Sequence, residues 1–160
     1  MGASMNDQGD NVIVFPGQEA AGPPAPATGR ELRALSERLH LLGCGLRAIA
    51  PHSEWTARQW MIASTQFRMR SAGTRGRLAR VAGAAGTSTR IIGRAVEIGY
   101  ACLETERALQ AVDRRLDDLM AATDSGTGAQ AARSFMADRR EALSAMDDLR
   151  LAIIREVSGA

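Results

Sequence analysis

A heptad-like repeat of apolar side chains in the C-terminal half of the chain constrains the fold most strongly. Two such stripes follow one another between residues 88 and 157, separated by the turn-forming sequence TDSGTG at 123–128. Alternating steps of three and four residues put side chains on one helix face, the face that packs against another helix. The sequence therefore predicts two long helices folded back on each other. The stripe residues are Ala95, Ile98, Cys102, Thr105, Leu109, Val112, Leu116 and Leu119, followed by Phe135, Ala142, Met146, Leu149 and Ile153.

The most regular apolar pattern of the chain predicts a further helix over residues 30–50. Thr28 and Glu31 have the spacing of a capping box, in which each side chain accepts a hydrogen bond from the other residue's backbone N–H. Pro51 is expected to end this helix. Six side chains repeat at steps of three and four residues, and we expect them to bind a partner helix or a second copy of the chain: Leu32, Leu35, Leu39, Leu42, Leu46 and Ile49.

The middle of the chain is harder to assign because it is rich in glycine. A helix is predicted over 53–70, and the two long helices are predicted over about 89–122 and 129–157. Four glycines lower the helix propensity of residues 71–88, since each costs about 1 kcal/mol relative to alanine inside a helix. We therefore predict a Gly/Arg-rich connector at 71–88. A continuous helix that packs through a face of small residues is the alternative.

The N-terminal residues 1–28 have the composition of a disordered tail. They contain four of the five prolines and too little apolar surface to offset the entropy lost on ordering. One short apolar motif, Val12-Ile13-Val14-Phe15, interrupts this composition. It is interpreted either as a loose extended segment or as a peptide that adds a strand to a partner's sheet. Residues 29–160 are predicted to form a single helical domain.

These patterns predict an all-α fold, an elongated helical hairpin or bundle of about four helices behind a disordered tail. The aromatic content of 4% indicates a core made of Leu, Ile, Ala and Met. No apolar run approaches the ~18 residues of a membrane span, and no secretory signal is recognised. Two cysteines are too few for a disulfide framework, which favours a cytoplasmic location. All 20 basic residues are arginine, as in a GC-rich bacterial genome.

Charge is distributed unevenly along the chain. Residues 55–96 hold eight arginines and no acid, whereas residues 97–160 hold eight arginines and twelve acids. Such a block fits a phosphate backbone, but it equally fits ion pairs with the protein's own acidic hairpin. A membrane-surface role for 55–70 is not favoured, because its polar face carries little charge. The candidate nucleic-acid-binding residues are Arg68, Arg70, Arg75, Arg77, Arg80, Arg90 and Arg94.

Few reactive side chains have a spacing in the sequence that would bring them together in the fold. His40 and Cys44 are four residues apart on one predicted helix, but a zinc site would also require His52 and Cys102, and the usual zinc-binding spacings are missing. Adjacent acids on a helix point about 100° apart, and no phosphate-binding loop or nucleophile motif occurs. We therefore expect no enzyme activity, no cofactor and no metal.

The function that the sequence favours is that of a non-enzymatic helical interaction protein. It would act as an adaptor, regulator or assembly factor, and it would bind a partner protein or itself through the leucine-striped helices. Self-association into a homo-oligomer is expected under this hypothesis. The alternative is a nucleic-acid-binding accessory protein that uses the basic block at residues 58–94. These two hypotheses make opposite predictions for salt dependence, because phosphate contacts release counterions and apolar contacts do not.

Overall fold

The computed structural model describes residues 27–49, 57–87, 94–122 and 128–159, and within these ranges the chain is almost entirely α-helical. The elements are α2 (Gly29–Ala48), α3 (Ala57–Thr87), α4 (Arg94–Ala122) and α5 (Gly128–Ser158). No strand occurs in the described ranges. The all-α fold class and the four helices are therefore confirmed. The predicted tail at 1–28 lies outside the described residues apart from Ala27 and Thr28.

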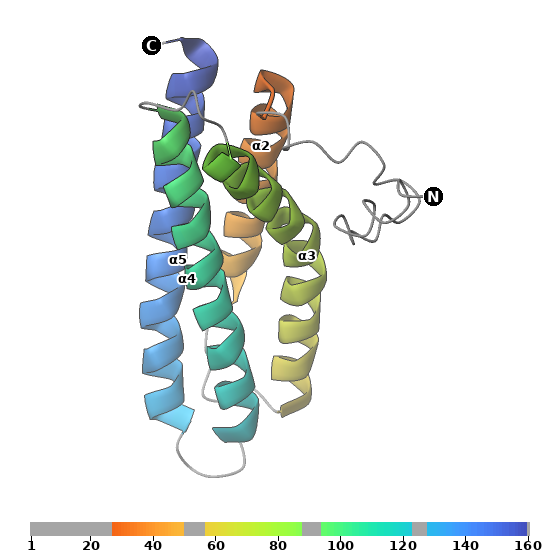
Figure 1. The fold of residues 1–160 in the computed structure, drawn as a ribbon. Coiled ribbons are helices and arrows are strands. Elements are labelled where there is room, and N and C mark those ends of the chain that lie inside the picture. The colour runs from red at the N-terminus through yellow and green to blue at the C-terminus, as the bar shows by residue number, and fades with distance from the viewer. Residues whose placement is uncertain (1–26, 50–56, 88–93, 123–127, 160) are drawn as a thin grey trace, which may run out of the picture.

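The four helices form an elongated antiparallel bundle (Figure 1). Each helix packs against the next one in the chain, and α5 closes the ring against α2. The most extensive contacts join α4 to α5, and the sparsest join α2 to α3. Figure 1 also shows that α2 covers only part of the height of the bundle. The α2/α3 side is consequently the least closed side of the molecule.

The start and the end of α2 are both stabilised by side chains. The predicted capping box is present: the backbone N–H of Glu31 donates to Thr28 Oγ1 over 3.1 Å, and the Glu31 carboxylate accepts from the backbone N–H of Thr28. At the other end, Arg139 of α5 donates from Nη1 to the carbonyl oxygen of Ile49 over 2.6 Å. This bond satisfies a carbonyl that a helix terminus leaves without an intrahelical partner. Pro51 lies outside the described residues.

The prediction of a Gly/Arg-rich connector at 71–88 is wrong for residues 71–87, since α3 continues to Thr87. Buried side chains continue at helical spacing beyond the predicted helix end at residue 70. Burial of this face against the bundle offsets the low propensity of the glycines, so tertiary packing overrides the local preference. Figure 1 shows α3 bending towards the start of α4 in this glycine-containing half. The buried residues of α3 are Trp60, Ser64, Phe67, Ser71, Thr74, Leu78, Val81 and Ala84.

The stripes that predict the α4/α5 hairpin form the centre of the core. From Ile98 onward every predicted stripe residue of α4 and α5 is at most 3% exposed. Thr105, the one polar member, donates from Oγ1 to the carbonyl oxygens of Ala101 and Ala145, over 2.7 and 3.3 Å. The second bond crosses from α4 to α5 and fixes the register of the two helices. The predicted first turn of α4, at 89–93, lies outside the described residues.

Candidate functional site

Four of the six arginines of α3 form two rows, because residues seven apart share a helix face. One row contains Arg68 and Arg75 and faces α4. Arg68 donates from Nη2 to Asp117 Oδ1 over 2.5 Å and to the carbonyl oxygen of Asp113 over 3.2 Å. The hydrogen bond to Asp117 raises the pKa of Arg68, and the nearby charges of Asp117 and Asp113 act in the same direction. Arg75 Nη1 lies 2.5 Å from Asp113 Oδ2 and its Nε lies 3.8 Å from Glu106. This row is therefore neutralised inside the protein.

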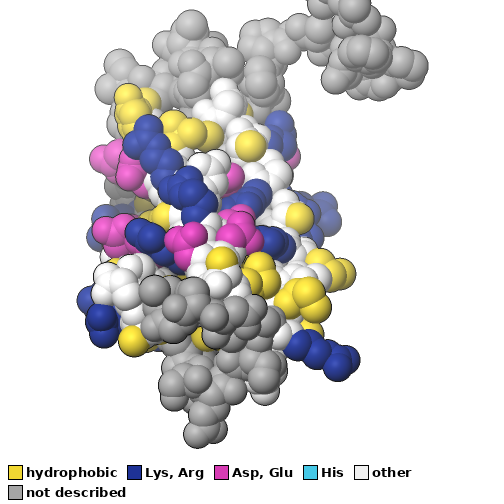
Figure 2. All heavy atoms as spheres, turned by 90° about the horizontal axis from the view of Figure 1, so that it is seen from below, with side chains coloured by type: hydrophobic (Ala, Val, Ile, Leu, Met, Phe, Trp, Pro, Cys, Tyr) yellow, Lys and Arg dark blue, Asp and Glu magenta, His cyan; other side chains and the backbone are white. Residues whose placement is uncertain are grey.

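Arg80 is neutralised in the same manner by α2. Its Nη2 donates to both carboxylate oxygens of Glu31, over 2.9 and 3.1 Å. The hydrogen bond from Arg80 is the largest of the effects that lower the pKa of Glu31. Glu31 thus serves the capping box of α2 and the contact with α3 at once. On the face of the molecule that Figure 2 shows, blue arginine and magenta acidic side chains are intermingled.

The second row, Arg70 and Arg77, faces α2 and forms no ion pair with the described carboxylates. Arg38 of α2 likewise forms no ion pair within the described ranges. Of the other predicted residues, Arg90 lies outside the described ranges, and Arg94 is the first residue of α4. Within the described residues, the predicted basic block therefore divides into the paired Arg68, Arg75 and Arg80 and the row of Arg70 and Arg77, which forms no ion pair.

A groove of about 560 Å³ runs between α2 and α3 and is flanked by Arg38 and Arg70. A smaller hollow of about 150 Å³ continues it along the same helix pair. The walls are mainly apolar or small, and Leu41 on the rim is 68% exposed. We call this feature the α2/α3 groove; the two hollows share Leu42, Gly45, Ala48 and Arg70, and the larger one is also lined by Arg38, Leu41, Cys44 and Thr74.

Two glycines leave room for the arginines that flank the α2/α3 groove. A Cβ atom built on Gly45 of α2 would lie 3.2 Å from Arg70 Nη1, and one built on Gly73 of α3 would lie 3.1 Å from Arg38 Nη1. Each helix therefore supplies a glycine beneath the arginine of the other. Sequence analysis missed Arg38 and Leu41, since both lie off the apolar stripe of their helix. Gly45, inside the helix predicted over 30–50, is a sequence signal for this arrangement, whereas Gly73 falls in the stretch predicted as a connector.

The leucine stripe predicted to bind a partner is buried inside the bundle. Its six side chains, from Leu32 to Ile49, are between 0% and 7% exposed. In this structure they form part of the core rather than an open surface. Partner binding through them would require α2 to leave the bundle.

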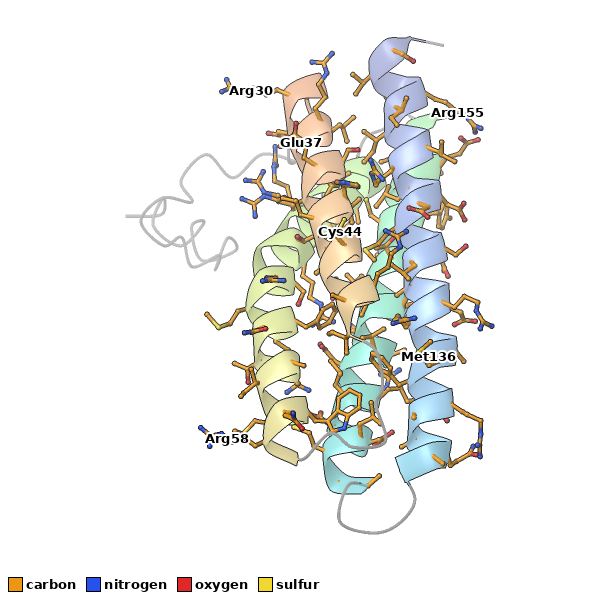
Figure 3. All side chains as sticks on the ribbon, turned by 180° about the vertical axis from the view of Figure 1, so that it is seen from behind. Arg30, Glu37, Cys44, Arg58, Met136 and Arg155 are labelled. Atoms are coloured by element: carbon orange, nitrogen blue, oxygen red, sulfur yellow. The ribbon has the colours of Figure 1, made fainter. Side chains whose placement is uncertain are left out.

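The two cysteines have different surroundings. Cys102 is buried in the core, and burial raises the pKa of its thiol to about 12. Cys44 is exposed on α2 (Figure 3), where its Sγ lies 3.9 Å from Nε2 of His40. His52 lies outside the described residues. Across the described ranges, no three His, Cys, Asp or Glu side chains converge as a metal site would require.

Comparisons with known proteins give no relative of this chain. No family model matches it, and neither the curated proteins nor the solved structures contain a match. In the described part, none of the helices has the length and apolar character needed to cross a membrane. The functional interpretation is based on the residues of the α2/α3 groove.

Proposed function

We propose that this protein is a non-enzymatic interaction protein that binds an acidic, apolar segment of a partner protein in the α2/α3 groove. The observation that carries the proposal is the pair of arginines, Arg38 and Arg70, that flank an apolar groove without a carboxylate partner among the described residues. The role is that of an adaptor, regulator or assembly factor. Its two free cysteines fit a reducing compartment such as the bacterial cytoplasm.

The chemistry of the groove favours a ligand with both apolar and anionic groups. Arginine presents a planar fork of donors that matches the two oxygens of a carboxylate. Apolar walls add affinity by removing the partner's side chains from water. Amphipathic segments that dock into a groove between helices use this combination of anchors and flanking charges.

Binding of nucleic acid is the second candidate, and the same unpaired arginines favour it. Arg38 and Arg70 are available to phosphates, whereas Arg68, Arg75 and Arg80 are engaged by the protein's own carboxylates. The charge of Arg77 acts on Glu31 without forming an ion pair with it. Three of the seven arginines that the sequence suggested are thus paired within the described residues, and the side chains of Arg90 and Arg94 are not described. The salt dependence of any such binding would be correspondingly shallow. The logarithm of the binding constant falls with the logarithm of the salt concentration, with a slope of about one for each phosphate contact.

Fluorescence anisotropy with four labelled probes tests both candidates. The probes are a designed amphipathic peptide with glutamates beside its apolar face, the same peptide with lysines, a DNA duplex and a DNA single strand. The proteins are the wild type, the double variant Arg38→Glu/Arg70→Glu, and Arg58→Glu as the control. Arg58 is exposed at the start of α3, outside the groove (Figure 3).

We expect the acidic peptide to bind the wild type and Arg58→Glu, and to bind the double variant at least about tenfold more weakly. Equal binding to the wild type and the double variant, or no binding of the acidic peptide, would overturn the proposal. DNA binding that weakens with salt and disappears in the double variant, without peptide binding, would establish the nucleic-acid candidate instead.

A further inference from the structure

We infer that the protein's own segment from Asp10 to Glu19 docks in the α2/α3 groove and competes there with the partner. The inference rests on the groove of the proposed function and names a second, intramolecular ligand for it. The sequence of this segment is DNVIVFPGQE, four consecutive apolar residues between two acids. The segment lies outside the described residues, and its sequence, its charge and the number of residues between it and α2 support the docking.

The charge of the N-terminal region complements the groove. Residues 1–26 contain Asp7, Asp10 and Glu19 and no arginine, lysine or histidine. The groove presents Arg38 and Arg70 with no described carboxylate beside them. Charges of opposite sign attract, and the attraction is strongest where water is partly excluded. The apolar residues Val12 to Phe15 match the apolar walls between these arginines.

A groove on another side of the bundle has the wrong charge for this segment. It lies between α4 and α5, has a volume of about 500 Å³ and is lined by Glu104, Glu141 and Asp148. Arg107 is the only cation among the residues that line it. An acidic segment would be repelled there. Of these two grooves, charge therefore selects the one between α2 and α3.

The connection between the segment and the groove is long enough. Twelve residues lie between Phe15 and Thr28, and the connection spans up to about 45 Å when extended. Arg38 lies nine residues beyond Gly29, or about 14 Å along the axis of α2. Ala48, at the far end of the groove, lies about 28 Å from Gly29 by the same measure. Phe15 can therefore reach every part of the groove.

Because the segment is covalently attached to the groove's own chain, its docking does not depend on the concentration of a free ligand in solution. Covalent attachment through a short linker corresponds to an effective concentration in the millimolar range. A partner must displace the segment, so its apparent affinity falls by the fraction of molecules in which the groove is occupied. The N-terminal region would thus set a threshold for partner binding.

Backbone ¹⁵N relaxation of the full chain tests the docking without any probe. We expect the amides of Val12 to Phe15 to show heteronuclear NOE values close to those of the helices. In Arg38→Glu/Arg70→Glu these values should fall to those of Gly2 to Asn6, while Arg58→Glu leaves them unchanged. Low values for Val12 to Phe15 in the wild type, or high values that persist in the double variant, would overturn the inference.

The exposed thiol of Cys44 gives a second test, because it lines the groove whereas Cys102 is buried. Val14→Asp/Phe15→Asp should raise the rate of Cys44 alkylation by N-ethylmaleimide at least about threefold, since undocking uncovers the groove. Ala20→Asp/Ala21→Asp adds the same charge outside the apolar motif and should leave the rate unchanged. Equal rates in the wild type and in Val14→Asp/Phe15→Asp would contradict docking.

The acidic peptide separates this inference from the proposed function. If both hold, Val14→Asp/Phe15→Asp binds the peptide at least about threefold more tightly than the wild type. If the wild type and this variant bind the peptide equally well, the inference fails and the proposed function stands. If Val12 to Phe15 are ordered against the arginines but neither protein binds the peptide, the inference stands and the proposed function fails.

Discussion

Arg70 of α3 extends over Gly45 of α2, and a Cβ atom at Gly45 would lie only 3.2 Å from Arg70 Nη1. The same relationship occurs in reverse between Arg38 of α2 and Gly73 of α3, at 3.1 Å. In both cases a glycine inside a helix gives space to an arginine of the neighbouring helix. These crossed contacts keep both guanidinium groups beside the α2/α3 groove, where no described carboxylate neutralises them.

Gly45→Ala tests whether this space serves stability or the groove. Alanine is favoured over glycine inside a helix by about 1 kcal/mol, and the flexible tip of Arg70 can move by a few tenths of an ångström. We therefore expect the free energy of unfolding, measured by urea denaturation, to rise by about 0.5–1 kcal/mol. We also expect weaker binding of the acidic peptide, because the new methyl group displaces Arg70. Gly76→Ala is the control: its Cβ would meet nothing within 4 Å, so stability rises without any loss of binding.

The glycines also explain what the sequence could and could not predict. The stripe from Leu32 to Ile49 and the stripes of α4 and α5 follow from local periodicity, and all three are buried. The use of the Leu32–Ile49 stripe does not follow from it, because this stripe was predicted to bind a partner and the structure places it in the core of the bundle. The length of α3 does not follow from its sequence, because the low propensity around Gly73 and Gly76 is outweighed by packing against other helices. Propensity is a local property, whereas the burial that offsets it depends on neighbours distant in the sequence.

Two buried serines on α3 form a matched pair for mutation. Ser64 and Ser71 are each 1% exposed and seven residues apart on one face. Ser71 donates from Oγ to the carbonyl oxygen of Arg68 over 3.1 Å, whereas Ser64 Oγ has no hydrogen-bond partner in the described structure. A buried hydroxyl without a partner costs about 1–3 kcal/mol.

We therefore expect Ser64→Ala to raise the free energy of unfolding by about 1 kcal/mol, helped by the higher helix propensity of alanine. Ser71→Ala loses a hydrogen bond and should change stability by less than about 0.5 kcal/mol, since the two effects oppose each other. Urea denaturation of both variants gives the comparison. A loss of stability in Ser64→Ala would show that its hydroxyl has a partner.

The partners of the arginines are a second feature that the sequence left open. The counts of charge predicted a basic block, and pairing with the acidic hairpin was one of two interpretations. The seven-residue spacing of Arg68 and Arg75 determines that they share a face, but not that this face meets Asp113 and Asp117. That outcome depends on which helix lies beside α3. The division between paired and unpaired arginines is consequently a property of the fold.

Asp113 lies beside both Arg68 and Arg75, so stability should be sensitive to its mutation. Its Oδ2 lies 2.5 Å from Arg75 Nη1, and its Oδ1 lies 3.7 Å from Arg68 Nε. Asp113→Asn leaves the largely buried Arg75 without its closest anion. We therefore expect the free energy of unfolding to fall by about 2 kcal/mol. Asp147→Asn is the control, because its pair with Arg47 spans 3.6 Å between half-exposed side chains and contributes less than about 1 kcal/mol. Equal effects of the two changes in urea denaturation would refute the importance of burial.

Cys102 should make the protein less stable in alkaline solution. Burial raises the pKa of its thiol from 9.0 to about 12, so the folded protein keeps the proton that the unfolded chain releases. The unfolded state therefore gains stability as the pH rises above about 9, and the contribution of Cys102 to folding decreases by about 1.4 kcal/mol per pH unit until the folded thiol also ionises. Urea denaturation between pH 8 and 10.5 measures the slope. Above about pH 9, the free energy of unfolding of Cys102→Ala should fall with pH by about 1.4 kcal/mol per unit less steeply than that of the wild type. Cys44→Ala should fall as steeply as the wild type, because it keeps Cys102. Identical slopes for the wild type and Cys102→Ala would mean that this thiol ionises in the folded protein as readily as in the unfolded chain.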